Sequence, residues 1–275
     1  YFALLVLSLA IFLYSLSSYS LTTKIIANKS SSSSSFSSQM SAISKLPKAV
    51  VFPPPAGNKA TATFIFFHGL GDRGQSFADI AISLHKLDQY KHIKFVFPNA
   101  PVKPISFQGG YKMPAWFDIY ELGARPDTKQ DVSGFLYACE ELVNGFIKQE
   151  VDAGIPSNRV VIGGFSQGAA ISLSTTAITN YPLAGTVVWS GFCGITNDIQ
   201  KKVTEVNKNT PIVQFHGTAD PVIPYSIGKR TYEFCKNLGF SKLNFTSYEG
   251  MPHTTCAPEM QTVFQFLAEV LPAKY

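Results

Sequence analysis

The chain lacks acidic residues throughout its first quarter: no Asp or Glu occurs before Asp72. Five lysines do occur there, and they account for the whole formal net charge of +5. The rest of the chain therefore carries equal numbers of basic and acidic residues. A balanced charge gives no electrostatic basis for nucleic-acid binding, and we predict no nucleic-acid partner.

Cysteine is also scarce. The four cysteines, at positions 139, 193, 235 and 256, form no C-x-x-C pair and show no spacing typical of metal ligands. This pattern excludes a disulfide-rich scaffold and gives no reason to expect a metal site. We expect four reduced thiols, most of them buried in the core.

The N-terminal segment differs in composition from the rest of the chain. Its apolar run, "YFALLVLSLAIFLYSL", is shorter than the ~20 residues of a membrane-spanning helix, and a serine tract follows it. The run fits the apolar part of a signal peptide or a short anchor, or the segment is an upstream extension before a natural start at Met40. A transit peptide is less favoured because no Arg precedes Arg73. We predict an extension over residues 1–45 and one folded domain over residues 46–275.

Strand-like and helix-like segments alternate regularly after residue 48. The strand-like runs are rich in β-branched and aromatic residues, which is typical of strands covered on both faces. Alternation of strands with helices predicts an α/β fold with a mainly parallel sheet. The expected strands lie at 48–53, 63–69, 93–98, 159–166, 183–190, 211–217 and 243–250, and the expected helices at 77–89, 132–152, 167–179, 225–238 and 258–271.

The sequence "GFSQG" follows a buried strand-like run and precedes a helix-like segment. It fits G-x-S-x-G, the nucleophile elbow, which places a serine on a sharp strand-to-helix turn. Small residues on either side of the serine allow the two chain segments to pass closely. We therefore predict that Ser166 is a catalytic nucleophile.

A nucleophilic serine needs a base and an acid that orients the base. Asp220 and His253 each follow a strand-like run, in the chain order Ser, Asp, His that this motif predicts. His253 is the only histidine after Asp220. His216 is a weaker candidate base, more typical of a structural turn, and Asp118 is a candidate acid that breaks the order.

The loop "HGLGDRG" has the G-x-G-x-x-G spacing of a dinucleotide-binding loop. Such a site needs an acidic residue at the end of the next strand, but Asp88 precedes that strand instead. An acyl-transfer site needs backbone N–H groups aimed at an oxyanion. We therefore predict an oxyanion hole formed by the main-chain N–H groups of Leu70 and Gln167, in which the Gln167 side chain is dispensable.

Six motifs together resemble one known family. "FFHGLGDRG", "FPNAP", "MPAWFD", "IPSNRVVIGGFSQG", "HGTADPVIP" and "YEGMPHTTC" are similar to motifs of the acyl-protein thioesterases, of a plant-like type, and of their carboxylesterase and lysophospholipase relatives. The resemblance covers the chain from about residue 48 onward. It implies an α/β-hydrolase fold, no cofactor, the triad Ser166–Asp220–His253, and the oxyanion donors Leu70 and Gln167.

The resemblance also implies a substrate-binding segment that contains Gln108 and Trp116. The family usually has Asn where Gln108 stands, so this chain departs from the pattern near the expected acyl channel. The implied reaction is cleavage of long-chain acyl thioesters from S-acylated proteins. A lysophospholipase or carboxylesterase acting on lipid or small acyl esters is the alternative, and a receptor that has kept a hydrolase fold is disfavoured because all three triad residues are present.

The resemblance bears on location as well, because S-acylated protein substrates face the cytosol. We therefore expect a cytoplasmic enzyme that contacts the membrane surface transiently. The secretory pathway or a membrane anchor is the alternative if the apolar N-terminus is functional. Asn244, in "NFT", would then be a candidate glycosylation site, although it lies in a strand-like run. The sequence leaves the oligomeric state open.

Overall fold

The computed structural model describes residues 46–121 and 129–273. The chain divides into two units, residues 1–44 and 45–275, and all the described residues lie in the second. The predicted N-terminal extension lies outside the described residues. Within the two described ranges, no helix is both long enough and apolar enough to cross a membrane.

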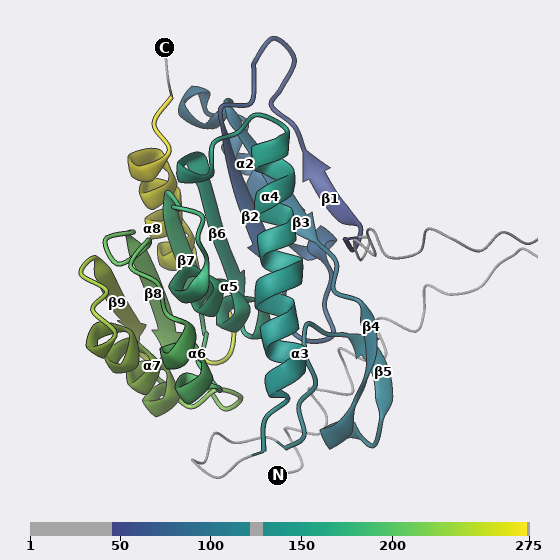
Figure 1. Cartoon of the computed structure of the whole chain (residues 1–275). Helices are drawn as coiled ribbons and strands as arrows, with labels where there is room; N and C mark the ends of the chain where they lie inside the picture. Colours follow the sequence, from purple (N-terminus) through teal and green to yellow (C-terminus); the bar gives the residue numbers. More distant parts are fainter. Residues whose placement is uncertain (1–45, 122–128, 274–275) are drawn as a thin grey trace, which may run out of the picture. The chain divides into compact units, whose positions relative to one another are not determined.

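A seven-stranded sheet forms the centre of the domain (Figure 1). Its strand order is β1-β3-β2-β6-β7-β8-β9, and only β1 runs antiparallel to its neighbour. The strands are β1 (Ala49–Phe52), β2 (Ala62–Phe67), β3 (Ile93–Pro98), β6 (Val160–Phe165), β7 (Gly185–Trp189), β8 (Ile212–Gly217) and β9 (Leu243–Tyr248). The prediction of an α/β fold with a mainly parallel central sheet is confirmed.

Helices cover both faces of this sheet and bury alternate residues of each strand. One face packs α3 (Val132–Tyr137), the π-helical segment η4 (Ala138–Val143), α4 (Asn144–Asp152), α5 (Gln167–Ile178), α6 (Thr196–Lys202) and α7 (Tyr225–Asn237). The other face packs α2 (Ala78–Leu84) and α8 (Ala257–Val270). On β2, for example, Ile65 and Phe67 face the first layer, whereas Phe64 and Phe66 face the second. Burial on both faces explains why these strands are apolar without alternation.

Two strands and one helix were not predicted. A separate antiparallel hairpin joins β4 (Val102–Ile105) to β5 (Tyr111–Pro114), and α6 follows β7. Two predicted helices also differ: the one at 77–89 is helical in α2 only as far as Leu84, and the one at 132–152 contains the π-helical segment η4. The hairpin matters for the site because residues 115–117 follow it directly.

The parallel strands bring loops that are distant in the sequence to one end of the sheet. Strands β2, β6, β8 and β9 all run in the same direction, so the loops that follow them meet at their carboxyl ends (Figure 1). Ligand sites of open α/β sheets lie at such an edge. The loops after these four strands contain Leu70, Ser166, Asp220 and His253, in that order.

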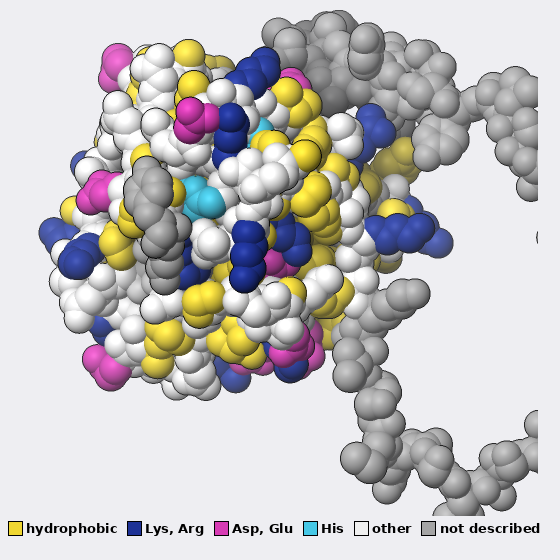
Figure 2. Space-filling model, turned by 90° about the horizontal axis from the view of Figure 1, so that it is seen from above, with side chains coloured by type: hydrophobic (Ala, Val, Ile, Leu, Met, Phe, Trp, Pro, Cys, Tyr) yellow, Lys and Arg dark blue, Asp and Glu magenta, His cyan; other side chains and the backbone are white. Residues whose placement is uncertain are grey.

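The end of the domain near its C-terminus carries charges of both signs. Figure 2 looks down on this end and shows Lys and Arg side chains with Asp and Glu among them and with uncharged residues between. On the described part of this face, the charges therefore do not form one continuous basic patch. That distribution agrees with the balanced charge of the sequence after Asp72.

Candidate active site

Ser166 lies at the junction of β6 and α5 in a strained backbone conformation. Its φ and ψ angles are 55° and −116°, a region that non-glycine residues rarely adopt. Its amide donates to the Trp189 carbonyl at 2.9 Å, which ties the turn to the neighbouring strand. Strain held in this way by surrounding structure is typical of functional sites.

The glycines of the motif have the steric role predicted for them. A Cβ atom added to Gly164 would lie 2.3 Å from the carbonyl carbon of Gly168, and one added to Gly168 would lie 1.9 Å from the Phe67 oxygen. Contacts that short are impossible, so only glycine fits at both positions. The close passage keeps Ser166 at the sharpest point of the turn.

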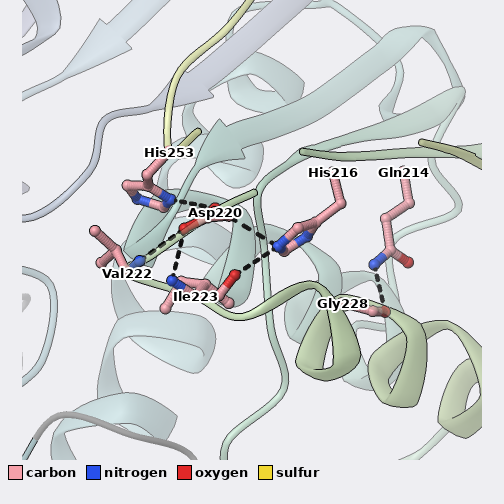
Figure 3. A network of polar contacts seen from close by, with 7 residues as sticks. All are labelled: Gln214, His216, Asp220, Val222, Ile223, Gly228 and His253. Carbon is pink, nitrogen blue, oxygen red and sulfur yellow. Dashed lines mark hydrogen bonds and ion pairs between the residues drawn. The ribbon is translucent and has the colours of Figure 1, made fainter. Parts of the chain in front are cut away.

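Asp220 and His253 form a hydrogen-bonded pair (Figure 3). The His253 Nδ1 atom lies 2.7 Å from Asp220 Oδ2. The other carboxylate oxygen, Oδ1, accepts hydrogen bonds from the amides of Val222 at 2.9 Å and Ile223 at 2.8 Å. Both oxygens of the acid are thus held by donors.

These donors also set the charge of the acid. Burial by itself raises the pKa of Asp220, but the hydrogen bond from His253, its charge and the two backbone amides together lower the pKa below its ordinary value. Asp220 is therefore ionised at neutral pH. An ionised acid at Nδ1 fixes the tautomer in which the opposite nitrogen, Nε2, is free to accept a proton.

The His253 ring packs against Phe165, the residue before the serine, with 4.7 Å between ring centroids. Ser166 and His253 are both described, and in this conformation no hydrogen bond joins them. Catalytic hydrogen bonds often tighten only when substrate is bound. The geometry therefore brings base and acid into contact, and the ring that packs on the base belongs to the residue directly before the serine.

The two predicted oxyanion donors remain available to a ligand. Neither the Leu70 N–H nor the Gln167 N–H has a hydrogen-bond acceptor among the described residues. Two hydrogen bonds hold the loop, one before Leu70 in the sequence and one after it. The Trp116 indole donates to the His68 carbonyl at 2.8 Å, and the Gly71 amide donates to the Pro114 carbonyl at 2.8 Å. Two of its glycines have structural reasons: Gly71 has a φ of 78°, and a Cβ on Gly74 would lie 2.2 Å from the Phe97 oxygen.

The Gln167 side chain has a role that the sequence did not indicate. It is buried, its Oε1 accepts from the Trp116 amide at 3.1 Å, and its Nε2 donates to the Phe117 carbonyl at 3.0 Å. The nucleophile elbow is thus tied to the segment after the hairpin. These contacts lead us to replace the expectation that this side chain is dispensable by the prediction that its loss lowers activity.

The two predicted substrate-binding residues lie in different surroundings. Gln108 is exposed at the turn of the β4–β5 hairpin, at the end of a short 3-10 helix. Trp116 is fully buried and its indole N–H is already used by His68. In this structure the Trp116 side chain supports the Leu70 loop, and the substrate-binding roles of residues 108 and 116 stay predictions.

The structure also separates the two alternative candidates from the base and acid roles. Asp118 accepts hydrogen bonds from the amide and the hydroxyl of Ser106, which tie it to the turn of the hairpin. His216 is buried behind Asp220, on the side opposite His253 (Figure 3). Neither residue replaces Asp220 or His253 in the pair.

Comparison with known proteins identifies the family of the chain. The model of a family described as phospholipase/carboxylesterase matches residues 48–271. Acyl-protein thioesterase 1 of Candida albicans is 45% identical over 79% of this chain and 96% of its own length. The corresponding protein of Debaryomyces hansenii is 42% identical over 77% of this chain and 92% of its own.

Solved structures give the same result. SOBER1 of Arabidopsis thaliana superposes with a TM-score of 0.70 at 31% identity, covering 76% of this chain and 99% of its own. Acyl-protein thioesterase 2 of Zea mays superposes with a TM-score of 0.68 at 28% identity, covering 82% and 99%. The chain therefore belongs to the phospholipase/carboxylesterase family of α/β hydrolases.

Proposed function

We propose that the protein is a serine hydrolase that cleaves long-chain acyl thioesters from S-acylated proteins through an acyl-enzyme. The observation that carries this proposal is the pair formed by His253 and Asp220 at 2.7 Å, at the same sheet edge as the strained Ser166. No cofactor enters the proposed reaction.

In the first half-reaction, Ser166 Oγ attacks the carbonyl carbon of the substrate while His253 Nε2 takes the hydroxyl proton. The carbonyl oxygen becomes negatively charged and is stabilised by the Leu70 and Gln167 N–H groups. The bond from carbon to sulfur then breaks, and His253 gives its proton to the departing thiolate. The ionised Asp220 stabilises the imidazolium that exists between these two proton transfers.

In the second half-reaction, water attacks the acyl-enzyme. His253 removes a proton from the water, and the same two N–H groups stabilise the second oxyanion. Collapse of this intermediate returns the proton to Ser166 Oγ and releases the fatty acid. Nucleophilic catalysis thus replaces one difficult hydrolysis with two easier steps.

The choice of a thioester substrate is supported by the relatives that carry the name acyl-protein thioesterase at 36–45% identity. The family description, which names phospholipase and carboxylesterase, supports the alternative of lipid or small acyl esters. All three substrate classes use the same triad and oxyanion donors. They differ in the acyl chain and in the leaving group.

The experiment is a comparison of kcat/KM for a palmitoylated peptide, a lysophospholipid and a short acyl ester with the same purified protein. We expect the palmitoylated peptide to give the highest value. A lysophospholipid that is turned over at least tenfold more efficiently would replace the thioesterase proposal by the alternative. Absence of turnover with all three would reject the hydrolase.

We further propose that the enzyme acts in the cytoplasm and contacts the membrane surface only to collect its substrates. Such substrates face the cytosol, and the four cysteines are free thiols, as suits a reducing compartment. The test is to express the whole chain and a form that starts at Met40, each with a C-terminal fluorescent tag. A glycosidase-sensitive shift, at Asn244 on the exposed edge strand β9, would place the whole chain in the secretory pathway instead.

A further inference from the structure

His216 is a second histidine on the acid of the proposed triad. It lies near the end of β8, is fully buried, and approaches Asp220 from the side opposite His253 (Figure 3). Its Nε2 atom is 2.8 Å from the Ile223 carbonyl oxygen and 3.6 Å from Asp220 Oδ2. The first contact is a hydrogen bond, and the second is an electrostatic contact at slightly longer range.

The contacts define the tautomer of this ring. A carbonyl oxygen can only accept, so Nε2 carries the proton. The other nitrogen, Nδ1, is buried and has no hydrogen-bond partner among the described residues. Burial lowers the pKa of His216, although the Ile223 carbonyl and the Asp220 charge act to raise it. The ring is therefore neutral at neutral pH, with its one N–H directed to the loop that holds the acid.

Ile223 connects the two ends of this arrangement. Its N–H donates to Asp220 Oδ1 at 2.8 Å, while its carbonyl accepts from His216 at 2.8 Å. The two groups lie on either side of the same Cα atom, so a shift of the Ile223 backbone would disturb both hydrogen bonds. The orientation of the carboxylate thus depends on the position of the imidazole.

The imidazole is itself fixed by α7. A Cβ atom on Gly228 would lie 2.4 Å from His216 Nδ1, so the helix packs directly onto the ring. Gln214, two residues earlier on the same strand, donates through Nε2 to the Gly228 carbonyl at 2.9 Å (Figure 3). Two side chains of β8 therefore fix its neighbours: Gln214 bonds α7, and His216 bonds the loop between β8 and α7.

We propose that His216 is a positioning residue for the reaction: its neutral imidazole holds the Ile223 carbonyl and faces Asp220, so that the Ile223 N–H stays on the carboxylate and Oδ2 points at His253. The inference rests on the proposed function, since it assigns His216 to the same triad. His216 does not contact the reacting atoms and acts only through Asp220.

The test compares side chains that differ in what they can donate. His216→Leu removes the donor at similar volume. His216→Gln places an amide N–H close to the position of Nε2, and His216→Asn has an amide too short to reach Ile223. We expect His216→Leu and His216→Asn to lower kcat about 10- to 100-fold, as misplacement of a catalytic group does, with KM within about twofold of wild type. His216→Gln should recover most of that loss.

His92 offers a matched control. It is also buried, its Nε2 lies 2.8 Å from the Leu271 carbonyl oxygen, and its Nδ1 has no partner among the described residues. It precedes β3 and so lies at the amino ends of the strands, whereas the site lies at their carboxyl ends. His92→Leu should lower Tm as His216→Leu does, yet leave kcat unchanged.

A readout independent of turnover is the NMR signal of the His253 Nδ1 proton, which lies in the hydrogen bond to Asp220. A carboxylate that is held less firmly makes a weaker hydrogen bond, so this signal should move upfield in His216→Leu and His216→Asn and stay at its wild-type position in His92→Leu. The titratable groups that face His216 are Asp220, His253 and Tyr225, whose ring centroid lies 6.2 Å from that of His216.

Two results would overturn the proposal. One is a His253 Nδ1 proton signal and a kcat in His216→Leu equal to those of His92→Leu; the other is His216→Gln as impaired as His216→Asn. If His216→Leu does not fold, the Gln and Asn variants still decide. If the wild type hydrolyses none of the substrates, the proposed function fails, and the His253 Nδ1 proton signal still tests the link from His216 to Asp220.

Discussion

The side-chain oxygen of Gln167 accepts a hydrogen bond from the backbone amide of Trp116 at 3.1 Å. This contact joins the residue after the nucleophile to the segment that follows the β4–β5 hairpin. Trp116 in turn donates from its indole to the His68 carbonyl at the start of the Leu70 loop. The two predicted oxyanion donors are thus coupled through one buried tryptophan.

Gln167→Ala should lower activity, although the main-chain N–H of residue 167 remains. The change leaves the Trp116 amide and the Phe117 carbonyl without their buried partner, at about 1–3 kcal/mol for each such group. We expect a lower Tm and a kcat reduced at least about tenfold, because the Leu70 loop loses its support. Thermal denaturation and steady-state kinetics measure the two effects.

Asn207 provides the control for this variant. Its side chain is also buried and also bridges two backbone groups, accepting from the Leu183 amide at 2.9 Å and donating to the Tyr181 carbonyl at 3.0 Å. It precedes β8 and so lies at the amino ends of the strands, away from the site at their carboxyl ends. Asn207→Ala should lose comparable stability while kcat stays near wild type. Equal kcat in the two variants would show that Gln167 supports folding alone.

Leu70→Pro should remove an oxyanion donor, because proline has no N–H. Loss of one such donor costs about 10²–10³ in turnover. Leu70→Ala keeps the donor and should retain most activity. Circular dichroism and Tm of both variants separate loss of the donor from loss of the fold, and a folded Leu70→Pro with wild-type kcat would exclude Leu70 from the oxyanion hole.

Glu259 should make stability depend on pH. It is fully buried in the first turn of α8, its Oε2 accepts from the Cys256 amide at 3.3 Å, and its Oε1 has no partner among the described residues. Burial raises the pKa of this carboxyl to about 8. Between the ordinary pKa and about 8, the unfolded chain has lost the proton that the folded protein keeps, so stability falls as pH rises through this window.

Glu259→Gln keeps an acceptor for Cys256 and removes the ionisation. The free energy of unfolding of wild type should fall by up to about 1.4 kcal/mol per pH unit across that window, and this part of the slope should be missing in the variant. Glu269→Gln changes an exposed residue of the same helix and should keep the wild-type slope. Urea titrations at several pH values measure the slopes, and parallel curves for wild type and Glu259→Gln would contradict the expectation.

The main strands were predictable because they are buried on both faces. The runs that became β2 and β6, for example, are apolar and bounded by turn residues. The β4–β5 hairpin was not predictable, since "VKPI" and "YKMP" contain Pro and Lys and bury little surface. Helix α6 was missed because "TNDIQKK" is short and contains one apolar residue.

The candidate site also contains residues that the sequence could predict and residues that it could not. Ser166, Asp220 and His253 could be predicted as a site because each follows a strand, and a parallel sheet brings strand ends together. The supporting residues were missed because their contacts join segments far apart in the sequence: Gln167 bonds Trp116 and Phe117, some fifty residues earlier. No local pattern signals such a contact. The role of His216 was masked in addition by its resemblance to an ordinary turn histidine.

The most direct test of the account is to trap the acyl-enzyme. The protein is mixed with a palmitoylated peptide, quenched with acid within one turnover, and digested for mass spectrometry. We predict a palmitoyl group on the Ser166 peptide of the wild type, and neither an adduct nor turnover with Ser166→Ala. A palmitoyl group on another residue, or undiminished turnover by Ser166→Ala, would contradict the proposed mechanism.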